Sequence, residues 1–177
     1  MKLLSTFAAT AASLAFAMPA AALTTLFAAH LDGPSEVPSN ASPAFGDALV
    51  TLDDTVFTVA VHVTFSGLTQ PATAAHIHCC TAVPGTGNVG VFQGFSGFPS
   101  ATAGTYVNTF PLSSGAFSTL LTGIQQGRSY VNIHDSAFPG GEIRGFLQAV
   151  PEPETWALML GGLGLAGAAI QRRRITA

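Results

Sequence analysis

A strict alternation of apolar and more polar side chains between residues 57 and 65 limits the fold of this chain more than any other feature. Every odd position in this segment is apolar, namely Phe57, Val59, Val61, Val63 and Phe65. A period of two turns one face of an extended strand toward a core and the other toward solvent. The segment therefore predicts a half-buried β-strand.

Other strand-like segments fill the central part of the chain, and clusters of Gly, Pro, Ser and Asn separate them. They lie at 24–31, 46–53, 73–78, 104–110, 116–121, 128–134 and 142–149. No segment between the two ends of the chain shows a clear helical stripe. Short strands with frequent turns are typical of an antiparallel sandwich. We therefore expect an all-β domain, an antiparallel β-sandwich, over residues 23–150.

The charged residues are few, and their balance excludes one class of partner. The whole chain has six Lys and Arg residues and nine Asp and Glu residues, a net charge of −3. The domain at 23–150 has two arginines against seven acidic residues, a net charge of −5. Nothing in this balance attracts a phosphate backbone, so we expect no nucleic-acid partner.

The first 22 residues have the three parts of a secretory signal peptide. A lysine at position 2 precedes an apolar run over 3–18, and small residues follow at 20–22. We expect signal peptidase to cut between Ala22 and Leu23, with cleavage after Ala21 as the alternative. An N-terminal anchor helix is the other interpretation, but the apolar run is short for a membrane span.

The C-terminal segment 151–177 combines a Pro-Glu-Pro sequence, an uncharged stretch and a cluster of arginines. The residues at its two ends are Pro151, Glu152, Pro153, Arg172, Arg173 and Arg174. A helix over the uncharged stretch 155–170 would be about 24 Å long, slightly short of a hydrocarbon core of ~30 Å. The positive-inside rule keeps the arginines in the cytoplasm and places the domain outside. The segment therefore predicts a short transmembrane helix.

The order of these three parts resembles a PEP-CTERM sorting signal over residues 151–174. The resemblance implies a Gram-negative bacterium with an exosortase, a membrane protease that recognises the tail and cleaves near the Pro-Glu-Pro. It also implies transient anchoring in the inner membrane before the protein reaches the cell surface, the extracellular space or an exopolysaccharide matrix. A permanent single-pass anchor is the alternative.

Three histidines form the candidate site. His76 and His78 alternate along one predicted strand, so both side chains lie on the same face. His134 ends the predicted strand at 128–134, and the three imidazoles could meet if the two strands are neighbours. Imidazoles at alternate strand positions are a common way to hold Zn²⁺ or Cu²⁺. The alternative is that these histidines connect loops through hydrogen bonds and that the protein needs no cofactor.

The two cysteines of the chain, Cys79 and Cys80, are adjacent. Thiols of exported proteins tend to oxidise, so we favour a vicinal disulfide that stiffens the loop at 81–85. Pairing with other chains, thiolate ligation of a metal beside His78, and an unpaired pair in a tight turn stay open.

A strong turn signal, Pro-Gly-Gly at 139–141, divides the segment 130–146 and predicts a hairpin-like pair of strands. Beyond the turn, Glu142 and Arg144 share one face of the chain. We expect them to form a local ion pair, with a role in ligand binding as the alternative. Together with Asn132 and the three histidines they form the polar face on which we expect the protein to act.

Three sequence blocks carry a resemblance that covers most of the chain. They are FAAHL at 27–31 followed by EVP at 36–38, AAHIH at 74–78, and YVNIH at 130–134 followed by FPGGEIRG at 138–145. These blocks resemble the CHRD domain, a module first described in chordin, over about 27–148. The resemblance implies an extracellular β-rich module with no established catalytic residues to carry over.

Together these features predict an exported, surface-sorted protein with a structural or adhesive role. Its expected partners are the signal peptidase, the exosortase, and extracellular polysaccharide or envelope components. The alternative is a copper- or zinc-binding protein or metalloenzyme that uses the three histidines. The chain has no G-x-S-x-G, H-E-x-x-H or P-loop pattern, so no enzymatic activity follows from its motifs.

Overall fold

The computed structural model of the chain describes residues 24–151 and 160–163. The expected signal peptide, its cleavage site at Ala22 and Leu23, and the sorting residues Glu152, Pro153 and Arg172 to Arg174 lie outside these residues. Within the described ranges, no helix has the length and apolar character needed to cross a membrane.

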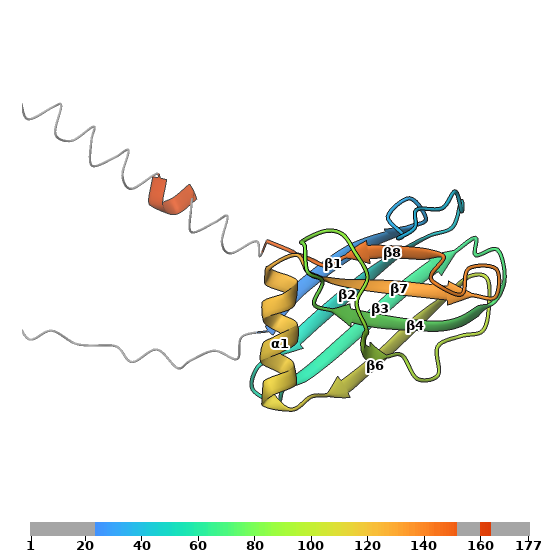
Figure 1. The fold of residues 1–177 in the computed structure, drawn as a ribbon. Helices are drawn as coiled ribbons and strands as arrows, with labels where there is room; N and C mark the ends of the chain where they lie inside the picture. Colours follow the sequence, from blue (N-terminus) through green and yellow to red (C-terminus); the bar gives the residue numbers. More distant parts are fainter. Residues whose placement is uncertain (1–23, 152–159, 164–177) are drawn as a thin grey trace, which may run out of the picture.

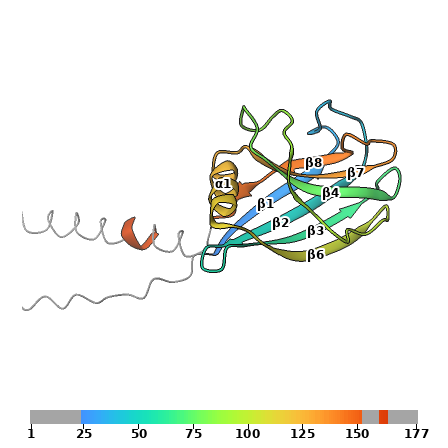
Figure 2. The same ribbon diagram turned by 60° about the horizontal axis from the view of Figure 1, so that its bottom comes forward.

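The strands form one antiparallel sheet (Figure 1). They are β1 (Thr24–Asp32), β2 (Phe45–Asp53), β3 (Thr58–Ser66), β4 (Ala72–Cys79), β5 (Val91–Gly94), β6 (Gly104–Pro111), β7 (Ser129–Asp135), β8 (Ile143–Phe146) and β9 (Gln148–Ala149). Their order is β5-β4-β7-β8-β1-β2-β3-β6, with β9 also paired to β1. The expected all-β class is confirmed, but the layers belong to one continuous sheet that curls over its own core (Figure 2).

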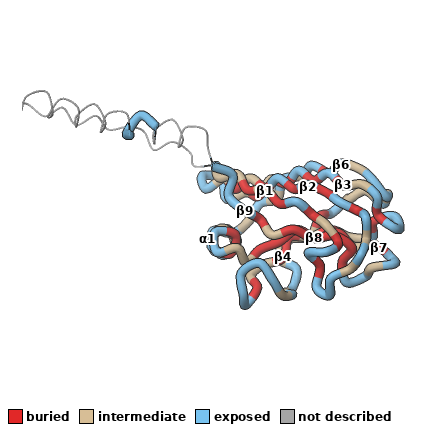
Figure 3. Tube along the Cα trace, turned by 90° about the horizontal axis from the view of Figure 1, so that it is seen from above, coloured by how far each residue is buried: buried red, intermediate tan, exposed pale blue. Residues whose placement is uncertain are grey.

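The core lies on the concave side of this sheet. In β3, Val59, Val61, Val63 and Phe65 are buried, whereas the even-numbered residues are exposed or half-buried, which confirms the predicted alternation from residue 58 onward. Phe57 instead lies in the preceding turn with a φ of 50° and is 39% exposed, so the prediction is wrong at that position. Nearly every residue of β7 is buried on both faces. Figure 3 shows this difference, with burial concentrated around β7 and β8 and exposed positions alternating along β1, β2 and β3. The core therefore covers one face of β7, and a separate, polar group of side chains covers its outer face.

Contacts between loops and strands hold the curl in place. The backbone N–H groups of Leu68 and Ala72 donate to the carbonyls of Thr102 and Ala101. The Phe95 ring, just after β5, stacks at 5.4 Å on Tyr106 of β6. Aromatic contacts thus join β6 at one end of the sheet to the segment that follows β5 at the other end.

One helix, α1 (Ser114–Gln125), occupies a segment for which the sequence predicts a strand at 116–121, and that prediction is wrong. The Ser113 side chain accepts a hydrogen bond from the Ala116 N–H at 3.2 Å and so caps the helix. The buried residues Phe117, Leu120 and Ile124 follow a helical spacing. The helix closes one end of the curled sheet (Figure 1), so tertiary burial of this stripe decides between helix and strand.

A candidate three-histidine metal site

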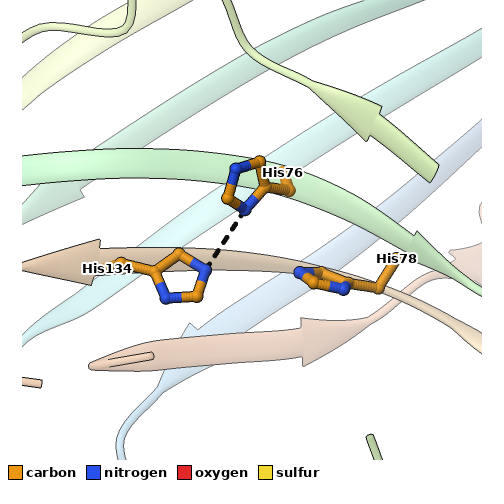
Figure 4. A group of neighbouring side chains, drawn as sticks. All are labelled: His76, His78 and His134. Atoms are coloured by element: carbon orange, nitrogen blue, oxygen red, sulfur yellow. Dashed lines mark hydrogen bonds between the residues drawn. The ribbon is translucent and has the colours of Figure 1, made fainter. Parts of the chain in front are cut away.

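The pairing of β4 with β7 brings the three candidate histidines together. The two strands are antiparallel neighbours, with Ala74 opposite His134 and His76 opposite Asn132. His134 is therefore diagonal to His76, and His78 lies two residues farther along β4 on the same face. The ring centroid of His76 lies 5.0 Å from that of His134 and 5.5 Å from that of His78 (Figure 4). These residues form the three-histidine cluster.

The nitrogen atoms of the cluster converge. Each histidine offers one ring nitrogen, and the three nitrogens lie within 4.8 Å of one another. The closest pair is His76 Nδ1 and His134 Nε2, which are 3.2 Å apart and joined by a hydrogen bond (Figure 4). In the part of the chain that the structure describes, no carboxylate or cysteine belongs to this group.

Backbone carbonyls set the protonation of two of the rings. His78 Nδ1 donates to the Val89 carbonyl at 2.8 Å, and His134 Nδ1 donates to the Pro139 carbonyl at 3.0 Å. A carbonyl only accepts, so Nδ1 carries the proton in both rings and each Nε2 keeps its lone pair. The Nε2 atom of His78 is buried and has no hydrogen-bond partner. The histidines are thus oriented as they are in metal sites, where the nitrogen away from the carbonyl binds the ion.

The cluster favours neutral imidazoles. Burial, followed by the neighbouring His134 and His78, lowers the pKa of His76 from its usual 6.5 to about 4. Burial also lowers the pKa of His134, and the hydrogen bond to the Pro139 carbonyl opposes that shift. Because a metal ion binds only neutral imidazole, these rings already have the charge state that ligation needs at neutral pH.

A stack of side chains supports His78 from behind. The Tyr130 ring lies parallel to the His78 ring, with 4.6 Å between centroids and 6° between planes. The guanidinium carbon of Arg144 lies 4.4 Å from the centre of the same Tyr130 ring. Tyr130 thus lies between His78 and Arg144, which belongs to a charged network.

That network contains a charged residue that the sequence reasoning did not select, Glu36. Arg144 pairs with Glu36 Oε2 at 2.6 Å, and Asn132 Nδ2 donates to Glu36 Oε1 at 2.6 Å. The same guanidinium donates to the Gly87 carbonyl at 3.0 Å and to Asn88 Oδ1 at 2.8 Å. Both members of the ion pair have side chains only 1% exposed. We call Glu36, Asn132 and Arg144 the Glu36 network.

The prediction of an ion pair between Glu142 and Arg144 is wrong. The Glu142 carboxylate accepts hydrogen bonds from the Thr69 N–H at 2.9 Å and from Ser42 Oγ at 2.6 Å. It is fully buried among these loop residues, while Arg144 turns toward Glu36. The polar face expected from the sequence is therefore three separate groups, of which the three-histidine cluster is the one whose ring nitrogens converge.

The two cysteines lie apart from the cluster. Cys79 and Cys80 form a disulfide. Their sulfurs pack against Gly123 of α1 so closely that a Cβ atom at that position would overlap both. The sulfurs thus connect β4 to α1, and neither belongs to the group of converging ligand atoms.

Comparisons with known proteins identify both parts of the chain. A family model for the CHRD domain matches residues 27–147, and one for the PEP-CTERM protein-sorting motif matches residues 149–174. Neither a curated protein nor a solved structure matches the chain. The sorting motif implies processing by an exosortase and export to the cell surface or the extracellular space. Because the first match spans more than half of the sequence, the chain belongs to the CHRD domain family.

Proposed function

We propose that this exported protein binds a divalent transition metal, copper or zinc, through His76, His78 and His134. One observation carries the proposal: the buried Nε2 atom of His78 has no hydrogen-bond partner and faces ligand nitrogens of two other imidazoles within 4.8 Å. Buried polar atoms in folded proteins are almost always paired, so an unpaired one among imidazoles favours an ion as its partner.

The choice of metal follows from the ligand chemistry. Imidazole nitrogens suit copper and zinc, whereas calcium and magnesium prefer oxygen ligands. Two of the rings are held by backbone carbonyls, which fixes their orientation before an ion arrives. Binding at His76 Nδ1 requires its proton to move to Nε2, because Nδ1 holds the proton in the hydrogen bond to His134.

Metal content tests this proposal. We expect full-length protein purified without chelator to bind zinc or copper in stoichiometric amount, measured by elemental analysis and by calorimetric titration. The double variant His76→Ala/His78→Ala should lose the metal. Since His78 is buried and its loss can affect folding, His134→Ala serves as a second variant that leaves the contacts of His78 with Val89 and Tyr130 intact.

The control is His62→Ala, which removes an exposed imidazole from β3, outside the cluster. It should leave metal binding unchanged. Protein that takes up neither metal, or a folded His134→Ala variant that binds as tightly as the unmodified protein, would contradict the proposal.

A structural or adhesive role at the cell surface is a second candidate, and the outer face of β2, β3 and β6 favours it. This face exposes apolar side chains, including Leu49 at 41% and Val107 at 70%. In the sheet, Leu49, His62 and Val107 form one row across the three strands. Replacing Leu49 and Val107 with Asp should release the protein from the cell surface, measured by fractionation; unchanged retention would argue against adhesion through this face.

Processing at both ends belongs to the same proposal. We expect cleavage after Ala22, transient anchoring in the inner membrane, and release near the Pro-Glu-Pro sequence. Replacing Pro151, Glu152 and Pro153 with alanines should leave the protein in the membrane fraction. Unchanged processing and release would contradict recognition at this motif.

A further inference from the structure

We propose that the metal-loaded three-histidine cluster binds a carboxylate-bearing ligand, which supplies the remaining ligand to the ion. This inference rests on the proposed metal site and adds the chemical class of what that site captures.

Charge balance is the first argument. The three protein ligands are neutral imidazoles, and in the described residues no carboxylate or thiolate joins them. A divalent ion bound here therefore keeps both of its positive charges. An uncompensated charge in a partly buried place is unfavourable, and an anion in the coordination shell relieves it.

The nearby carboxylates of the protein are already committed elsewhere. Glu36 is paired with Arg144 and accepts from Asn132. Asp135 follows His134 in β7 but points to the other face, where it accepts from the N–H groups of Gln70 and Phe138 at 2.7 and 2.6 Å. Among the described residues, neither of these carboxylates is free to compensate the charge of the ion, which favours an anion from outside the chain.

The cluster is open enough to receive it. His78 is 8% exposed, whereas His76 and His134 are half-buried and reach solvent. Three protein ligands leave at least one position free on zinc or copper, and a carboxylate oxygen is a normal ligand at that position. A hollow of about 400 Å³ begins at His76 and continues along Gly94, Phe95 and Phe98, which provides room for the rest of an organic ligand.

The charge of the domain makes this capture depend on the metal. Without an ion, the domain at 23–150 has two arginines against seven acidic residues and repels polyanions. Both arginines are engaged, Arg144 with Glu36 and Arg128 with the Ala82 carbonyl at 2.6 Å. The bound ion would be the feature that attracts a carboxylate.

The test uses full-length protein loaded with Cu²⁺, whose electron paramagnetic resonance and visible spectra report each ligand. Sodium acetate, added at constant ionic strength in a non-coordinating buffer, should shift both spectra in a saturable way. Polygalacturonate on beads should retain the loaded protein but not the chelator-treated protein, and neutral dextran should retain neither. His134→Ala should lose these responses, and His62→Ala should keep them.

The outcomes separate this inference from the metal site itself. In one outcome, the protein binds Cu²⁺ while acetate leaves its spectra unchanged and polygalacturonate does not retain it. That result overturns the carboxylate ligand and leaves the metal site standing. Protein that binds no metal overturns both. A response to acetate without retention on polygalacturonate supports a small carboxylate, and retention together with the acetate response supports a polymer.

Discussion

The Glu36 network and the three-histidine cluster both contact the Tyr130 ring, yet they differ in how their charge is balanced. In the Glu36 network, Arg144 neutralises Glu36 within the chain, although the buried Asn132 Oδ1 has no hydrogen-bond partner. In the three-histidine cluster, the nitrogens of three neutral rings converge, and the buried His78 Nε2 lacks a hydrogen-bond partner. A buried ion pair whose charges cancel stabilises the fold, whereas converging neutral imidazoles favour a cation as their ligand.

The largest effect should come from breaking the Glu36 network. Replacing Arg144 with Met leaves the Glu36 carboxylate buried without its cation, which should lower the free energy of unfolding by about 3–5 kcal/mol. Chemical denaturation measures the loss. The double variant Glu36→Gln/Arg144→Met should recover part of it, because it removes the unpaired charge. A loss below about 1 kcal/mol, typical of an exposed pair, would show that this network does not support the fold.

A smaller effect should follow from crowding the same network. Gly141 has a φ of 131°, and a Cβ there would overlap Asn132 Nδ2 and Glu36 Oε1. We expect Gly141→Ala to cost about 1–3 kcal/mol of unfolding free energy. Gly140→Ala is the matched control, since a Cβ at position 140 meets nothing within 4 Å. Equal stabilities of the two variants would show that this turn does not constrain the network.

The three-histidine cluster should make the free energy of unfolding depend on pH. Since the pKa of His76 falls from 6.5 to about 4 on folding, the unfolded chain binds more protons between these values. The contribution of His76 to stability is therefore complete above pH 6.5 and is lost as the pH falls toward 4. Unfolding of chelator-treated protein at several pH values should show this slope, and His76→Ala should flatten it. An unchanged slope in that variant would assign the proton uptake to another group.

The smallest effect should come from the exposed pair of His30 and Asp47, which are 3.0 Å apart on the outer face of β1 and β2. Both side chains are more than half exposed, so solvent screens the interaction. We expect His30→Ala to change the free energy of unfolding by less than about 1 kcal/mol. A loss as large as that of Arg144→Met would contradict the view that burial, rather than ion pairing, separates the strong network from the weak pair.

The predictable parts of this molecule are those with a short-range pattern. The alternation in β3 and the spacing of His76 and His78 are local, and neighbouring strands then suffice to bring His134 beside them. The segment of α1 misled the strand prediction because its threonines and serines favour extended chain as readily as helix. Its apolar positions at 117, 120 and 124 had the helical spacing.

The Glu36 network could not be predicted from such short-range patterns. Glu36 and Arg144 are 108 residues apart, and no periodicity connects a loop glutamate to a strand arginine. Glu142, two residues from Arg144, looked like the natural partner, but loop hydrogen bonds from Ser42 and Thr69 occupy it. Which of several acidic residues reaches a buried cation depends on how the loops close, which only the folded structure determines.

The close contact between Gly123 and the two disulfide sulfurs connects the packing of α1 to the oxidation state of the cysteines. In the reducing cytosol the two cysteines would be free thiols, and two unbonded sulfur atoms need more space than a bonded pair. Gly123 leaves no spare room at that point, because even a methyl group there would collide with both sulfurs. We therefore expect α1 to pack fully against β4 at Gly123 only when the two cysteines are oxidised.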